Sequence, residues 1–136
     1  MTFVITSVDA GSSRAHLVHT DAVNWILLQE GTDLTLIDGG YPGQADEVIA
    51  SITQLGRRPE DVRAALLTHA HVDHLGGLAK LVQRYQFPVY ADPAEVAHAR
   101  RDYLQQAGPR DVARAATHLR TWRWLAHVTP LGVLSR

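Results

Sequence analysis

The first forty residues alternate between apolar and polar positions in a way that predicts β-strands. A short strand is expected over Phe3 to Val8, whereas His16 to Thr20 is ambiguous. Two apolar runs, Val23 to Leu28 and Leu34 to Ile37, are separated by a segment that contains Gly31, a residue typical of turns. This spacing predicts a β-hairpin.

The rest of the chain predicts alternating helices and strands. A glycine-rich loop, Asp38 to Gly43, follows the hairpin and can approach a ligand closely. The elements expected after it are a helix over Ala45 to Leu55, a strand over Val62 to Thr68, a helix over Leu75 to Tyr85, a strand over Pro88 to Ala91, a helix from an N-cap at Asp92 to about Gln106, and a helix from Arg110 to about Val128. The pattern favours an α/β arrangement, a mixed sheet covered by helices.

Composition fits one ordinary globular domain of 136 residues, with 46% hydrophobic residues, 20% charged residues and a net charge of −1. Neither nucleic acid nor an anionic membrane is expected as a partner from that charge. The charge is uneven, because residues 100–136 contain seven arginines and two acidic residues. We therefore distinguish a strand and helix core over 1–99 from a basic helical segment over 100–136, which would face either an acidic partner or solvent.

The chain has no cysteine, so a metal ion would have to be bound by His, Asp or Glu. No basic N-terminal region followed by an apolar stretch marks a signal peptide, and no apolar run approaches the ~20 residues that cross a bilayer. A cytoplasmic location is the default expectation.

The residues that indicate chemistry lie directly after the strand predicted at Val62 to Thr68. His69, His71, Asp73 and His74 place three imidazoles and a carboxylate within six residues, a donor set suited to zinc, iron or manganese. His69 and His71 can point the same way from the strand end. Asp73 and His74 can reach a second position about 3.5–4 Å away, the usual spacing in a two-metal site.

This His-x-His-x-Asp-His motif resembles that of the metallo-β-lactamase-fold metallohydrolases. The upstream run Leu36 to Gly40 is similar to the strand ending in an Asp-Gly turn of that superfamily, and Leu75 to Leu78 is similar to the glycine pair that follows its motif. The resemblance covers roughly Val23 to Ala99 and implies the N-terminal half of an αββα sandwich, with helices on one face of the sheet.

The resemblance also implies a site and a reaction. His69 and His71 would bind the first metal, and Asp73 and His74 the second. Asp38 would either orient a ligand from beneath the site or serve only as a strand-end turn residue. Two zinc ions are implied in the complete protein, with iron or manganese as alternatives. A metal-bound hydroxide would attack an ester, thioester, lactone or amide carbonyl of a small molecule, and Asp73 would be the catalytic residue that orients the nucleophile and accepts its proton.

The sequence departs from the family pattern after residue 99. The third histidine of the first metal usually follows a Thr-Pro-Gly stretch, and here Thr129 to Gly132 has no histidine after it. His16, His19, His98, His118 and His127 are expected at surfaces or helix ends rather than as ligands. The alternative to an enzyme is therefore a non-catalytic metal-binding or dimerisation module. Because half of the apolar strand positions would lack a cover, a homodimer through that face is possible.

Overall fold

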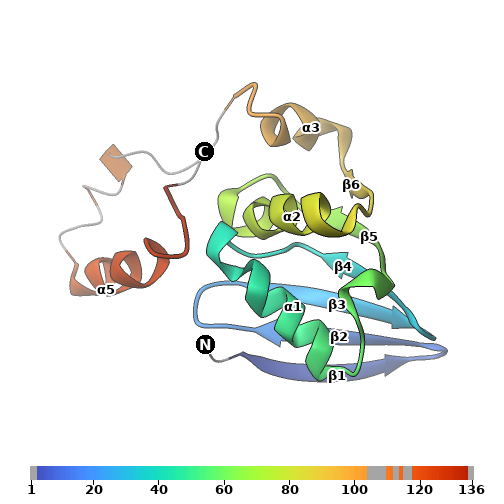
Figure 1. Ribbon diagram of the computed structural model, residues 1–136. Coiled ribbons are helices and arrows are strands. Elements are labelled where there is room, and N and C mark those ends of the chain that lie inside the picture. Colours follow the sequence, from blue (N-terminus) through green and yellow to red (C-terminus); the bar gives the residue numbers. More distant parts are fainter. Residues whose placement is uncertain (1–2, 104–109, 112–113, 115–117, 135–136) are drawn as a thin grey trace.

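A six-stranded mixed sheet organises the computed structural model, which describes residues 3–103, 110–111, 114 and 118–134 (Figure 1). Its strands follow one another across the sheet in chain order: β1 (Val4–Ala10), β2 (Ser13–His19), β3 (Asn24–Glu30), β4 (Asp33–Ile37), β5 (Val62–Leu67) and β6 (Val89–Ala91). The strands β1 to β4 pair antiparallel, and β5 and β6 are added parallel. The predicted hairpin is therefore confirmed, and the ambiguous segment around His16 to Thr20 is mostly strand.

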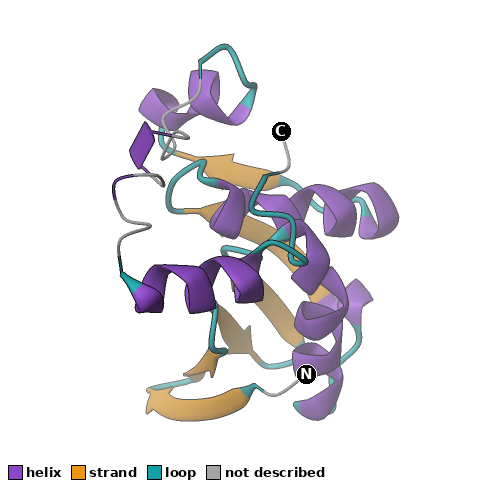
Figure 2. Cartoon of the chain, turned by 90° about the vertical axis from the view of Figure 1, so that its left-hand side faces the viewer, coloured by secondary structure: helices purple, strands orange, loops and turns teal. Residues whose placement is uncertain are grey.

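Helical segments lie between the parallel strands in the sequence and also follow the last strand. They are the 3-10 turns η1 (Pro42–Gln44) and η2 (Pro59–Asp61) and the helices α1 (Ala45–Gln54), α2 (Val72–Tyr85), α3 (Pro93–Ala99) and α5 (Leu119–Val128). The helices α1 and α2 lie on one side of the sheet, as the turned view in Figure 2 shows. Within the described ranges, no helix is long and apolar enough to span a lipid bilayer.

Strand alternation divides the apolar side chains between the two faces of the sheet. Trp25, Leu27 and Leu36 are buried beneath α1 and α2, where they form the main core. Their neighbours in sequence point the other way, and Leu17 and Leu66 on that second face are each 41% exposed. The expected fold class, a mixed sheet with helices on one face, is confirmed.

Three helix boundaries differ from those expected, and the first is the start of α2 at Val72 rather than at Leu75. The helix that begins at Pro93 ends at Ala99 rather than near Gln106, whose position lies outside the described residues. Arg101 adopts a left-handed conformation with φ 66°, and the Asp102 and Arg101 amides donate to the Ala97 and His98 carbonyls. This is the Schellman arrangement that closes a helix, here with arginine in the position that usually carries glycine.

The helix expected from Arg110 to Val128 is not continuous. Arg110, Asp111 and Arg114 are helical, but His118 has an extended backbone, with φ −105° and ψ 131°, and α5 begins after it at Leu119. Near its C-terminal end, α5 buries Val128 against Tyr41 and Val72. It thus packs against the start of α2, while Trp122 and Trp124 of the same helix are 58% and 45% exposed.

Candidate metal centre

The three histidines of the motif lie together where β5 leads into α2. Leu67 ends the strand, His71 is the N-cap residue of α2, and Asp73 and His74 lie in the first helical turn. The rings of His69 and His71 have centroids 4.6 Å apart, and those of His69 and His74 are 4.0 Å apart. A strand end followed closely by a helix start therefore brings imidazoles from three sequence positions into one cluster.

Glycines allow the loop after β4 to pass directly beneath this helix start. The Gly39 amide donates to the His74 carbonyl at 2.8 Å, and the Gly77 amide donates to the Gly40 carbonyl at 2.9 Å. A Cβ atom at Gly77 would lie 1.9 Å from the Gly39 carbonyl oxygen, well inside contact distance. The pair Gly39-Gly40 of the loop and the pair Gly76-Gly77 of α2 are thus in direct backbone contact. This contact holds Asp38, the residue before Gly39, close to His74.

Asp38 is a buried carboxylate that links three parts of the site. Its Oδ1 accepts from the Thr68 amide at 2.9 Å, and its Oδ2 accepts from the Thr68 hydroxyl at 2.7 Å. The same Oδ2 lies 2.8 Å from His74 Nδ1. Asp38 also has a left-handed φ of 61° at the end of β4. It is therefore a turn residue at the strand end and, at the same time, a residue that contacts His74.

The contact with Asp38 sets the chemistry of His74. Because Asp38 accepts at Nδ1, a neutral His74 carries its proton there and presents the lone pair of Nε2. Nε2 lies 3.4 Å from Asp73 Oδ2. Two ligands of a tetrahedral zinc ion, each bound at ~2.0–2.1 Å, are separated by about 3.3 Å, so these two atoms have the separation that a shared ion requires.

Burial and pairing shift the pKa values of the cluster in opposite directions. Burial alone would lower the pKa of His74, but its hydrogen bonds to Asp38 and Asp73 raise it to about 9. Burial tends to raise the pKa of both carboxyls, yet the hydrogen bonds from His74 hold the pKa of Asp38 and of Asp73 below the usual value. Burial and the neighbouring histidines lower the pKa of His69.

The donor chemistry of this cluster suits a metal ion, since imidazole nitrogens and carboxylate oxygens are the ligands that zinc takes in the absence of cysteine. Within the described part of the chain, however, no three His, Asp or Glu side chains already form a group that could hold an ion. That His69, His71, Asp73 and His74 bind metal therefore stays a prediction.

Two residues of α3 that the sequence did not indicate border the motif. Glu95 accepts a hydrogen bond from the backbone amide of Ala70, between the first two histidines, at 2.9 Å. His98, expected at the surface or a helix end, lies in the last turn of α3 and is 2% exposed. Its ring meets His71 edge-on with centroids 5.5 Å apart. The early end of α3 is consistent with this position, because the segment after it turns back so that Tyr103 stacks on His98.

A family model supplies the identity of this arrangement. The model described as the metallo-beta-lactamase superfamily matches residues 20–135. The chain belongs to the metallo-β-lactamase superfamily.

Its relatives within the superfamily include proteins named for different substrates. A ribonuclease from Thermus thermophilus is 40% identical over 121 residues, which cover 80% of this chain and 27% of the relative. A hydroxyacylglutathione hydrolase from Pectobacterium atrosepticum is 34% identical over 85 residues, covering 62% of this chain and 31% of the relative. The solved structure of the MIM-2 metallo-β-lactamase aligns with a TM-score of 0.62 at 32% identity, over 72% of this chain and 40% of that one.

The chain spans about a quarter to a third of the length of the curated relatives that it matches.

Besides His98, the four remaining histidines lie in other parts of the fold. His16 bonds with Ser7 and Gln29, and His19 with Asn24. His127 lines a separate cavity near Thr20. His118 precedes α5 as its N-cap residue.

Proposed function

We propose that this chain provides the metal-binding part of a metal-dependent hydrolase, with His69, His71, Asp73 and His74 as metal ligands. The observation that carries the proposal is the pairing of Asp38 with His74 Nδ1, which directs Nε2 toward Asp73 at 3.4 Å. A carboxylate that fixes the tautomer of a histidine is the usual support of a metal-binding imidazole. Membership of the metallo-β-lactamase superfamily supports the same assignment.

Zinc is the proposed metal, and when bound it would act as a Lewis acid and lower the pKa of a water molecule. The residues of the chain would prepare that chemistry. Asp38 holds His74 in one orientation, and the lowered pKa of Asp73 keeps its carboxylate ionised near neutral pH. An ionised Asp73 can both bind a cation and accept a proton from an attacking water.

The first proposed substrate class is a small molecule with an ester, thioester, lactone or amide carbonyl. The relative named hydroxyacylglutathione hydrolase supports a carbonyl substrate. A second candidate is phosphodiester hydrolysis. The relative named a ribonuclease covers the larger share of this chain, at 40% identity, and residues 100–136 contain seven arginines. If the substrate is a phosphodiester of a nucleic acid, the expectation drawn from the net charge, that nucleic acid is not a partner, is wrong.

The test uses the full-length protein loaded with zinc and a substrate panel that contains a lactone, a thioester and a phosphodiester. Turnover of one class is expected, together with its loss in Asp73→Asn and His69→Ala. The matched control is Asp46→Ala, which removes an exposed acid in the first turn of α1. If Asp73→Asn retains wild-type turnover when saturated with zinc, the ligand assignment is wrong. If wild-type protein binds no zinc and hydrolyses nothing, the chain is a non-catalytic module.

A further inference from the structure

The helix α3 contributes a residue to the metal site without contributing a ligand. Glu95 lies in its first turn, and its Oε2 accepts the hydrogen bond of the Ala70 amide at 2.9 Å. Ala70 is fully buried and lies between His69 and His71. Fixing this amide therefore restricts the backbone of the segment that carries both imidazoles.

The sequence context of Glu95 suggests a different role, which its side chain does not perform. An acid three residues after an N-cap Asp is typical of a capping box, in which the acid returns to the N-cap amide. Asp92 does cap the helix, since its side chain accepts from the Ala94 amide at 2.8 Å. The Glu95 side chain instead leaves its own helix and reaches the loop after β5. The contact is thus between two elements that are 25 residues apart in sequence.

His98 holds Glu95 in that direction. One turn further along α3, its Nδ1 lies 3.5 Å from Glu95 Oε2, and its ring is 2% exposed. The ring of His98 is stacked on Tyr103, with centroids 5.2 Å apart, and meets His71 edge-on. The Ala70 amide also makes the main contribution to lowering the pKa of Glu95, so the carboxylate is ionised when it accepts this bond.

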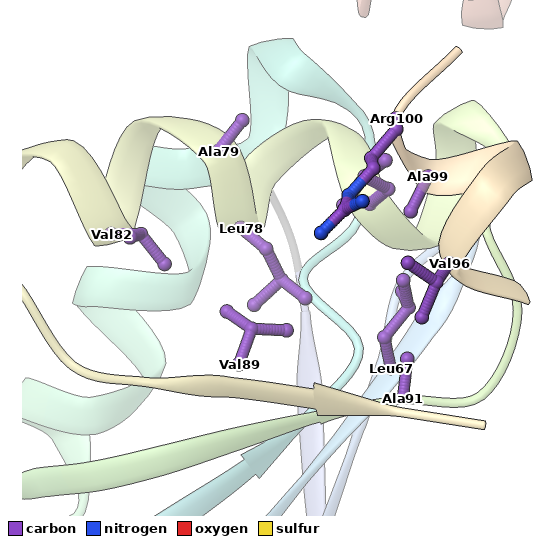
Figure 3. A pocket seen from close by; sticks show the side chains of 10 residues that line it. Leu67, Leu78, Ala79, Val82, Val89, Ala91, Val96, Ala99 and Arg100 are labelled. Atoms are coloured by element: carbon purple, nitrogen blue, oxygen red, sulfur yellow. The ribbon is translucent and has the colours of Figure 1, made fainter. Parts of the chain in front are cut away.

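The helix α3 also borders an apolar pocket. This pocket of about 350 Å³ lies between α3, α2 and the ends of β5 and β6, and Figure 3 shows Val96 and Ala99 of α3 across it from Leu78 and Val82 of α2. Glu95 does not line this pocket, and its side chain makes a polar contact between α3 and the loop after β5.

We propose that Glu95 is a positioning residue for the metal ligands. It fixes the Ala70 amide and thereby the relative directions of His69 and His71. This inference rests on the proposed metal-binding function. Supporting groups of this kind commonly change metal affinity by about 10–100-fold when they are removed. The role of Glu95 requires its acceptor oxygen and not its negative charge. The amide side chain in Glu95→Gln should therefore preserve the hydrogen bond to Ala70 and the positioning of the two histidines.

The experiment compares Glu95→Ala, Glu95→Gln and the control Asp46→Ala in the full-length protein, with two readouts. In the metal-free protein, amide hydrogen exchange at Ala70 should be at least ~10-fold faster in Glu95→Ala and unchanged in the other two variants. Competition with a chelator should show zinc affinity weakened by ~10-fold or more in Glu95→Ala only. The absorption spectrum of the cobalt-substituted protein should change with it.

The outcomes separate the two proposals. If wild-type protein binds no zinc, the proposed function fails, while exchange at Ala70 still reports whether Glu95 fixes the segment. If wild-type protein binds zinc and Glu95→Ala binds it equally well, Glu95 is not a positioning residue. A Glu95→Gln variant as impaired as Glu95→Ala would also overturn the inference, because charge would then matter rather than the hydrogen bond.

Discussion

Replacement of Gly77 by alanine tests whether close backbone contact builds the site. The added Cβ would lie 1.9 Å from the Gly39 carbonyl oxygen. An ordinary contact between carbon and a carbonyl oxygen is at least about 3.3 Å, so the loop and α2 would have to separate by about 1.4 Å. No side-chain rotation can relieve the overlap, because the backbone fixes the position of a Cβ atom and the Gly39 oxygen is itself a backbone atom.

The expected cost follows from the contacts that such a separation would break. Gly39 to His74 and Gly77 to Gly40 are hydrogen bonds of 2.8 and 2.9 Å, each worth about 1 kcal/mol, and overpacking adds about 1–3 kcal/mol. Alanine is favoured over glycine within a helix by about 1 kcal/mol, which offsets part of this loss. We expect the free energy of unfolding to fall by about 2–4 kcal/mol. Zinc affinity should fall with it, since the Asp38 contact to His74 would stretch.

Urea unfolding and chelator competition measure the two effects. Gly56→Ala is the control, because a Cβ there meets no atom within 4 Å while its φ of 70° still disfavours alanine. That strain alone should cost about 1–2 kcal/mol and leave zinc affinity unchanged. If Gly77→Ala is as stable as the wild type and binds zinc equally well, the contact between the two glycine pairs does not support the site.

Two further predictions concern the contact between Asp38 and His74, and a third concerns the exposed face of the sheet. Asp38→Asn should lower the pKa of His74 from about 9 toward its ordinary value, as measured by NMR titration of the metal-free protein, and should weaken zinc binding about 10–100-fold. The raised pKa of His74 stabilises the metal-free fold fully below pH 6.5. That contribution to the free energy of unfolding, at most about 3 kcal/mol, should be lost as the pH rises from 6.5 through about 9. In Asp38→Ala, the free energy of unfolding should change much less with pH across this range. The 136 residues expressed alone should self-associate through the second face of the sheet, and Leu17→Lys with Leu66→Lys should reduce the mass found by sedimentation; an unchanged monomer in both proteins would contradict this.

The sequence was sufficient for most elements because their signals are local. Alternation of apolar residues predicted the hairpin of β3 and β4, and the run Val62–Leu67 predicted β5. Other boundaries depended on unusual residues. The start of α2 was expected at Leu75 but lies at Val72, because a stretch rich in histidine and aspartate suggests a loop, and its N-cap residue, His71, makes no side-chain capping bond.

The partners in the supporting contacts of the site could not be predicted, since each contact joins residues far apart in the chain. The family resemblance offered Asp38 as a residue that orients a ligand, but it did not give the residue that Asp38 contacts. Asp38 and His74 are 36 residues apart, and their pairing depends on the close backbone contact beneath α2. Glu95 has the sequence signature of a helix cap, so its contact with Ala70 was invisible without the fold. The early end of α3 at Ala99 was equally hidden, because Arg101 occupies a left-handed position that usually signals itself by glycine.

The order of the strands has a consequence for how the chain folds as it is made. Each strand after β1 pairs with the strand synthesised just before it. Hairpins form in about 1–10 μs, whereas a ribosome adds only about 5–20 residues per second, so each antiparallel pair has time to form before the next strand is complete. The parallel strands must wait for a crossover helix. Asp38 therefore leaves the ribosome well before Thr68 and His74, and the metal ion that we propose for this cluster could be bound only after the first turn of α2 has been synthesised.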